Sequence, residues 1–234
     1  MKIKLAYLLP NFFTALSVFL GMMSIIASSQ GKFEKAFIYI VLSLIADGLD
    51  GRVARLTNTT SKFGVEFDSL ADIVAFGVAP AMMLFFAIGY EYGRFGALVS
   101  GLFVVFGAIR LARFNITTAE NDPRYFIGLP IPTAAVVLSS FIMLALNYKD
   151  SNFFILILAL FLAFLMVSNF RYPSFKKMDF QKNIALKVLV FIIIISSFIF
   201  LYPIEALAVL LGGYVLYGFL RGIINYFKAS KLKG

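Results

Sequence analysis

The chain has 234 residues, of which 61% are hydrophobic and 14% are charged, and its formal net charge is +9. Soluble domains carry about 25% charged residues, so this composition excludes an ordinary water-soluble globule and a disordered chain. Because Cys is absent, a disulfide-stabilised scaffold is excluded as well. We therefore expect an all-α integral membrane protein that forms a single domain over residues 1–234.

Apolar segments long enough to cross a bilayer recur along the whole chain and predict a polytopic bundle of about eight transmembrane helices. The first segment follows Lys2 and Lys4 without a clear small-residue cleavage site, so we interpret it as an uncleaved helix. The last two segments are expected to meet in a very tight turn at Tyr202-Pro203. In chain order, the expected helices are Leu8–Ser28, Phe37–Leu56, Asp68–Ala87, Arg94–Phe114, Gly128–Leu146, Asn152–Asn169, Ile184–Tyr202 and Ile204–Tyr226.

The basic residues predict how the bundle is oriented. With these eight helices, most Lys and Arg fall on the side of the membrane that holds both termini. The exceptions are Lys32, Lys35, Arg94 and Lys149. By the positive-inside rule, both termini are then cytoplasmic. A basic cytoplasmic face also explains the net charge without a nucleic-acid partner, and it favours contact with anionic lipids.

A second group of expectations concerns contacts between helices. Glycines at 89, 93, 96 and 101 suggest close helix contact. We expect this contact to include the interface of a homodimer.

Four aspartates interrupt the second and third hydrophobic segments, where charged side chains are costly and usually functional. Asp47 and Asp50 are three residues apart, and Asp68 and Asp72 are four apart, so each pair shares one face of a helix. The polar stretch from Leu56 to Phe63 is expected to return the chain. Two antiparallel helices would then direct all four carboxylates at one volume near the cytoplasmic surface.

The chemistry of this cluster indicates a metal site. The chain has neither His nor Cys, so its ligands are oxygens, which suit Mg²⁺ or Mn²⁺, with Ca²⁺ as another possible occupant. Four Asp are enough for two divalent cations about 3.5–4 Å apart that bridge phosphate oxygens of a substrate. We therefore predict two bound divalent cations.

The residues around the aspartates fit a phosphorylated ligand. Gly51, Ala54 and Gly64 lie on or near the Asp-bearing faces and leave room for a bulky group to approach the backbone. Arg55 and Lys62 are placed to meet phosphate oxygens.

Two other interpretations of the cluster remain open. The carboxylates could pair with Arg52 and Arg55 as a structural salt-bridge cluster, although four Asp exceed two Arg. They could also line a cation or proton pathway in a transporter. Transporter sites, however, tend to lie at the midplane between repeated halves, and the sequence offers no matching acidic pair elsewhere.

The aspartates belong to a longer pattern, D-x₂-D-G-x₂-A-R-x₈-G-x₃-D-x₃-D, and this chain resembles the CDP-alcohol phosphotransferase family that the pattern marks. Weaker similarity narrows the resemblance to CDP-diacylglycerol–serine O-phosphatidyltransferases, the membrane-embedded phosphatidylserine synthases. The residues that match the pattern are Asp47, Asp50, Gly51, Ala54, Arg55, Gly64, Asp68 and Asp72. The weaker similarity lies in Pro10-Asn11, Thr14, Phe76–Ala81, Arg110–Asn115 and Gly128–Pro132.

The resemblance implies that CDP-diacylglycerol and L-serine react to give phosphatidylserine and CMP at the cytoplasmic face of the cell membrane. It makes Asp72 the candidate base. Asp47, Asp50 and Asp68 become mainly metal ligands, with Asp72 as a further metal contact. The CDP-lipid would be bound by Gly51, Ala54, Arg55, Lys62 and Gly64. CDP-archaeol as donor, and glycerol phosphate or inositol phosphate as acceptor, remain alternatives within the family.

Serine recognition requires a cation for its carboxylate. Arg110 and Arg113 end the fourth expected helix, and we predict that one of them binds the carboxylate through two hydrogen bonds, with Asn115 and Asn11 nearby. The competing interpretation makes both arginines membrane anchors whose side chains extend to lipid head groups. A phosphorylated acceptor would need more cations than these two.

Overall fold

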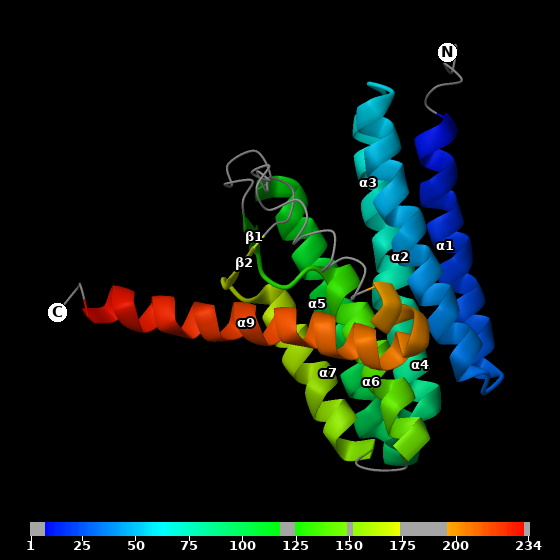
Figure 1. The fold of residues 1–234 in the computed structure, drawn as a ribbon, viewed down its shortest axis with the longest axis vertical. Coiled ribbons are helices and arrows are strands. Elements are labelled where there is room, and N and C mark those ends of the chain that lie inside the picture. Colours follow the sequence, from blue (N-terminus) through cyan, green and yellow to red (C-terminus); the bar gives the residue numbers. More distant parts are fainter. Residues whose placement is uncertain (1–7, 118–124, 149–151, 174–195, 232–234) are drawn as a thin grey trace.

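The computed structural model describes residues 8–117, 125–148, 152–173 and 196–231 (Figure 1). Helices account for nearly all of these residues, which confirms the all-α prediction. The elements are α1 (Leu8–Ser29), α2 (Phe33–Leu56), α3 (Lys62–Asp72), η2 (Ile73–Val78), α4 (Ala79–Ala87), η3 (Gly89–Tyr92), α5 (Gly93–Thr117), β1 (Tyr125–Ile127), α6 (Ile131–Tyr148), α7 (Asn152–Val167), β2 (Arg171–Pro173) and α9 (Pro203–Lys231).

Helices α1 and α2 form a long antiparallel pair held by hydroxyl groups as well as by apolar contact (Figure 1). The Oγ atoms of Ser17 and Ser43 are 2.7 Å apart, and Ser43 Oγ also donates to the Ser17 carbonyl. Ser24 Oγ donates to the Ala36 carbonyl at 3.0 Å. In an apolar surrounding such interhelical hydrogen bonds stabilise the pair, and they fix α2 against α1 along its length.

The third expected helix begins earlier than predicted. It starts at Lys62 rather than Asp68, because the side chain of Ser61 caps it by accepting a hydrogen bond from the Gly64 amide at 3.0 Å. The return segment therefore covers only Thr57–Ser61, and Asn58 turns it with a φ of 51°. Asp68 consequently lies within α3, not at its start.

The helix that begins at Lys62 continues to Ala87 as α3, η2 and α4, and its middle section, η2, is π-helical. A Cβ atom added at Gly21 would lie 2.8 Å from the Cα of Ala75, so α1 and η2 approach closely at this point. π-Helical turns are uncommon and often lie at functional sites. Here the π-helical turn begins directly after Asp72.

The core is formed by apolar side chains of η2, α4, α5, α6 and α7. Phe76, Met83, Phe103, Leu138 and Leu156 are among its fully buried members. These helices form the lower half of the molecule in Figure 1, beside the α1–α2 pair.

A two-stranded antiparallel sheet was not predicted. β1 and β2 pair with Phe126 opposite Tyr172. The chain turns after β1 at Gly128, whose φ of 76° suits glycine, so α6 begins at Ile131 and not at Gly128 as expected. Strands of three residues carry too little periodic pattern to be recognised in the sequence.

Helix α9 follows a short helical stretch at residues 196–201, from which Tyr202 separates it, in agreement with the predicted tight turn. In Figure 1 α9 runs crosswise to the other helices, packed against α6 and β2. Its Gly218 and Gly222 leave room for the rings of Tyr172 and Phe170, which a Cβ atom at either glycine would overlap.

Among the described residues, four helical stretches are long and apolar enough to cross a membrane: Leu8–Ser29, Lys62–Ala87, Gly89–Thr117 and Pro203–Asn225. The apolar helices Ile131–Asn147 and Asn152–Val167 are shorter. Most of the expected helix Ile184–Tyr202 lies outside the described residues, so the predicted count of eight spans stays a prediction.

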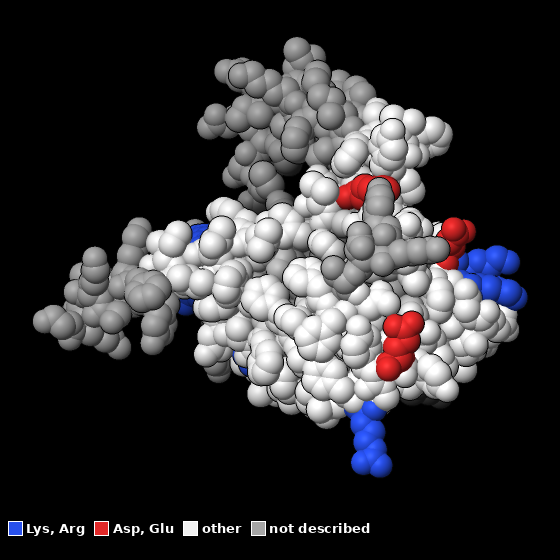
Figure 2. All heavy atoms as spheres, turned by 90° about the horizontal axis from the view of Figure 1, so that it is seen from below, with Lys and Arg blue, Asp and Glu red and all other residues white. Residues whose placement is uncertain are grey.

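The two ends of the bundle differ in the chain segments and side chains that they present. The start of α1, the end of α2 and the start of α3 lie at the same end (Figure 1). Seen from the opposite end, the surface consists mainly of uncharged side chains, with a few scattered charges (Figure 2). This distribution is compatible with the predicted orientation, which itself stays a prediction.

Candidate active site

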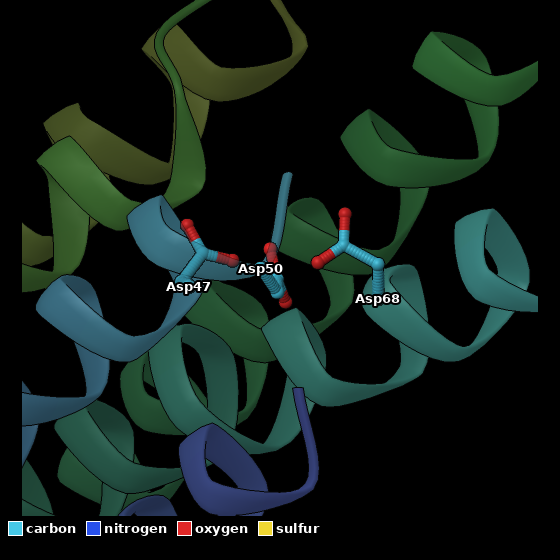
Figure 3. A group of neighbouring side chains, drawn as sticks. All are labelled: Asp47, Asp50 and Asp68. Atoms are coloured by element: carbon cyan, nitrogen blue, oxygen red, sulfur yellow. The ribbon is translucent and has the colours of Figure 1, made fainter. Parts of the chain in front are cut away.

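Three carboxylates converge from two helices. Asp47 and Asp50 lie on α2 and Asp68 lies on α3, and one carboxylate oxygen of each is within 4.8 Å of the other two. Figure 3 shows the three side chains directed toward one another across the gap between the helices. The predicted convergence of the two acidic pairs is thus present for these three residues.

The fourth carboxylate, Asp72, borders the trio. It is the last residue of α3, it is 8% exposed, and its side chain is within hydrogen-bonding reach of Asp47. One oxygen of Asp72 and one of Asp68 are buried without a hydrogen-bond partner among the described residues. Buried carboxylate oxygens are normally paired, so both atoms indicate a missing ligand.

Within the described part of the chain, no Lys or Arg forms an ion pair with any of these four carboxylates. The interpretation as a structural salt-bridge cluster with Arg52 and Arg55 is therefore not what the structure contains. Close, mostly buried carboxylates repel one another, and an oxygen-binding divalent cation relieves that repulsion. The donor set and its unpartnered oxygens thus fit a metal ion.

A cavity of about 190 Å³ lies beside the trio, between the start of α1, the end of α2 and the start of α3. Most of the residues predicted to bind a CDP-lipid line it, but Lys62 does not and is exposed. The lining residues are Pro10, Asn11, Thr14, Asp50, Gly51, Ala54, Arg55, Thr59, Thr60, Ser61, Gly64, Val65 and Asp68.

Hydroxyl groups in this cavity were not predicted as site residues. Thr14 Oγ1 donates to Asp50 Oδ2 at 2.7 Å and so fixes that carboxylate. Thr59, Thr60 and Ser61 add further hydroxyls from the return segment. The polar composition of the return segment could have indicated that its hydroxyls belong to the site. The hydrogen bond between Thr14 and Asp50 joins residues 36 positions apart, and no local sequence pattern predicts it.

The four residues predicted for the serine pocket are not grouped together. Asn11 lines the cavity just described, as Asp50 does. Asn115 exchanges hydrogen bonds with Ser69, at 3.0 Å for its own amide donor, and also reaches Glu66 at 3.5 Å, so it links α5 to α3.

Arg110 is the predicted serine-binding residue that faces the carboxylates. It is 6% exposed and interacts electrostatically with Asp72 and Asp47. Its guanidinium lies 5.2 Å from the ring centre of Phe114, and its Nε is buried without a partner among the described residues. A buried, incompletely paired guanidinium is suited to bind an anion.

Arg113 is already occupied by the protein itself. Its Nη1 donates to the Val167 carbonyl at 2.8 Å and to Asn169 Oδ1 at 3.3 Å. Its Nη2 donates to the carbonyls of Ser168, Met166 and Ile127 at 3.0, 3.2 and 3.3 Å. The side chain thereby holds the end of α7 and the end of β1 against α5.

The comparisons with known proteins agree with this geometry. The family model described as CDP-alcohol phosphatidyltransferase matches residues 7–167. A CDP-diacylglycerol–serine O-phosphatidyltransferase of Helicobacter pylori (strain J99) is 53% identical over 227 residues, which cover 95% of this chain and 94% of that protein.

Two archaeal proteins are also similar. A CDP-diacylglycerol–serine O-phosphatidyltransferase of Methanocaldococcus jannaschii is 34% identical over 92% of this chain and 94% of its own. An archaetidylserine synthase of Methanothermobacter thermautotrophicus is 38% identical over 74% of this chain and 72% of its own. With the family model spanning well over half of the residues, the chain belongs to the CDP-alcohol phosphatidyltransferase family.

Proposed function

We propose that this protein transfers the phosphatidyl group of CDP-diacylglycerol to the hydroxyl of L-serine, giving phosphatidylserine and CMP in a reaction that requires divalent cations. The observation that carries the proposal is the group of converging carboxylates beside a cavity, with two oxygens that have no hydrogen-bond partner among the described residues. The name of the Helicobacter pylori relative supports serine as the acceptor.

The cavity is the proposed position of the CDP group. Arg55 meets a phosphate oxygen there, Gly51 and Ala54 leave room for the ligand, and Lys62 acts from outside the cavity wall. Gly64 is confined because a Cβ atom at this position would lie 3.2 Å from Ser61 Oγ and press on the cap of α3. The lipid tails remain in the bilayer.

Asp47, Asp50 and Asp68 are the proposed ligands of two Mg²⁺ or Mn²⁺ ions, with Asp72 completing the set. When bound, these cations neutralise the pyrophosphate and stabilise the departing CMP. Thr14 supports this role by holding one oxygen of Asp50 in place.

Asp72 is the proposed general base. Its unpartnered oxygen is available to take the proton of the serine hydroxyl, while the serine oxygen bonds to the phosphorus that carries diacylglycerol. The bond from that phosphorus to the oxygen of CMP breaks, and CMP leaves with the bonding electrons. Arg110 binds the serine carboxylate, and its position next to Asp72 directs the hydroxyl toward the base.

The proposal also covers the orientation of the enzyme in the membrane, its oligomeric state and an alternative lipid donor. We infer that the acidic end of the bundle and both termini face the cytoplasm, where the basic residues concentrate, and that two copies associate as a homodimer. CDP-archaeol is the alternative donor, which the similarity to an archaetidylserine synthase supports.

The test uses the purified full chain in detergent with CDP-diacylglycerol and Mg²⁺ or Mn²⁺. CMP release is measured with L-serine, glycerol 3-phosphate and inositol phosphate in turn, and the series is repeated with CDP-archaeol. We expect release with L-serine alone. Release only with a phosphorylated alcohol would overturn the serine assignment. No release with any acceptor, together with cation flux in liposomes, would favour a transporter.

A further inference from the structure

The buried hydroxyl of Tyr172 has no hydrogen-bond partner in the part of the chain that the structure describes. Tyr172 lies on β2, its side chain is 0% exposed, and its hydroxyl forms no hydrogen bond with the described residues. A buried tyrosine normally finds a partner for its hydroxyl, because a hydroxyl that leaves water without a hydrogen bond destabilises the fold. An unpaired hydroxyl at this depth therefore calls for an explanation.

The Tyr172 ring is held in place from several sides. Its backbone pairs with Phe126 across the small sheet, and its ring centre lies 5.6 Å from that of Tyr214 on α9. Gly218 leaves the space that the ring occupies. The Tyr214 hydroxyl donates to the Pro173 carbonyl at 3.0 Å and so fixes α9 to β2. Packed in this way, Tyr172 does not turn its hydroxyl out to solvent.

Tyr214 links this hydroxyl to the acidic site. Its ring packs against that of Tyr172, and it interacts electrostatically with Arg110. Arg110 in turn neighbours Asp72. Electrostatic interactions through Tyr214 and Arg110 thus connect three atoms that have no hydrogen-bond partner among the described residues, namely the Tyr172 hydroxyl, Arg110 Nε and one oxygen of Asp72.

These groups complement a zwitterionic amino acid. The guanidinium of Arg110 suits a carboxylate, and Asp72 is placed to receive a hydroxyl proton. Burial raises the pKa of Tyr172, so the hydroxyl stays neutral and its oxygen can accept a hydrogen bond from an ammonium group. Glycerol phosphate and inositol phosphate carry no ammonium.

We propose that Tyr172 belongs to the acceptor subsite, where its hydroxyl oxygen accepts a hydrogen bond from the ammonium group of the serine whose carboxylate Arg110 binds. The inference rests on the proposed function. It adds to the acceptor subsite a residue that is distant in sequence from the aspartates and from Arg110. It makes the small sheet and α9 part of the specificity for an amino acid.

The test is Tyr172→Phe, which removes one oxygen and keeps the ring. We expect the KM for L-serine to rise about tenfold or more, because a hydrogen bond to a charged group is lost. The kcat and the affinity for CDP in the presence of Mn²⁺ should stay close to those of the unaltered protein. The melting temperature in detergent should be unchanged or higher, because the variant no longer buries an unpaired hydroxyl.

The matched control is Tyr202→Phe, which removes a hydroxyl from a tyrosine that is 55% exposed. It should change neither the KM nor the melting temperature. An unchanged serine KM in Tyr172→Phe would overturn the inference, as would a lower melting temperature without a KM change. If the unaltered protein binds CDP but does not use serine at all, the proposed function fails instead, so the two failures are distinguishable.

Discussion

The carboxylates of the site differ in their neighbours, and the neighbours indicate their roles. Asp50 is fixed by the Thr14 hydroxyl, and Asp68 joins Asp47 and Asp50 with one oxygen left unpaired. Asp72 lies deeper than Asp68 and beside Arg110. The proposed metal ligands beside the cavity and the proposed base, Asp72, are therefore separable by substitution.

Asp72→Asn is expected to separate chemistry from binding. The amide cannot take the serine proton, and a general base contributes on the order of 10²–10⁴-fold to a rate. The kcat for CMP release should fall by that factor, while CDP binding in the presence of Mn²⁺ persists. Asp68→Asn is the matched variant, and it should weaken Mn²⁺-dependent CDP binding itself. Turnover of Asp72→Asn at the unaltered rate would refute the assignment of the base.

The two arginines should respond differently to Lys. Arg110→Lys keeps the charge but loses the planar fork, so the KM for serine should rise while the melting temperature changes little. Arg113→Lys cannot make the bonds that Arg113 donates to the end of α7, so the melting temperature should drop. The account is contradicted if Arg113→Lys raises the serine KM at an unchanged melting temperature and Arg110→Lys does not.

At the scale of elements, the apolar segments of the sequence predicted most of the helices, because a helix in lipid must be apolar over its length. The start of α3 was placed six residues late, since the polar residues of its first turn resemble a loop and the Ser61 cap is a weak signal. The π-helical section after Asp72 depends on packing against α1, α5 and α6, which no local pattern reports.

The glycines of the η3–α5 region give a prediction about stability. A Cβ atom at Gly96 would overlap the backbone of Gly89, whereas a Cβ atom at Gly101 meets nothing within 4 Å. Gly96→Ala should therefore lower the free energy of unfolding by about 1–3 kcal/mol. Gly101→Ala should leave it unchanged or raise it, since alanine favours helix by up to about 1 kcal/mol.

Thermal unfolding in detergent compares the two variants. Equal melting temperatures would contradict the close contact between η3 and α5. This contact lies within one chain, so the expectation that these glycines form a homodimer interface gains no support from Gly89 and Gly96 and stays a prediction.

At the scale of the whole molecule, the sequence predicted the acidic cluster and drew attention to Arg110, but it gave no signal for the proposed part of Tyr172. Asp47 to Asp72 lie within one helix–turn–helix, so their spacing alone places them on facing surfaces. Four of the five partners of Arg113 lie more than 50 residues after it in the sequence, so only the tertiary fold brings them together. The tertiary fold also brings together Tyr172 on β2 and Tyr214 on α9, whose rings pack against each other. The structure gives Asn11 a place in the cavity beside the acidic cluster and bonds Asn115 to Ser69, and their predicted part in serine binding stays a prediction.

The orientation of the bundle can be tested because the chain has no Cys. A single Cys in place of exposed Thr57, in the α2–α3 turn, should react with a membrane-impermeant maleimide only after cells are permeabilised. A Cys in place of exposed Lys32, at the other end of α2, should react in intact cells. The reverse pattern would place the acidic site outside the cytoplasm.

The account depends most on the ability of the acidic cluster to hold metal. Equilibrium binding of Mn²⁺ to the purified chain, measured with CDP present and after treatment with a chelator, tests this directly. We predict two Mn²⁺ per chain for the unaltered protein and loss of both in a variant with Asn at positions 47, 50 and 68. Absence of Mn²⁺ binding, or equal binding by that variant, would contradict the account.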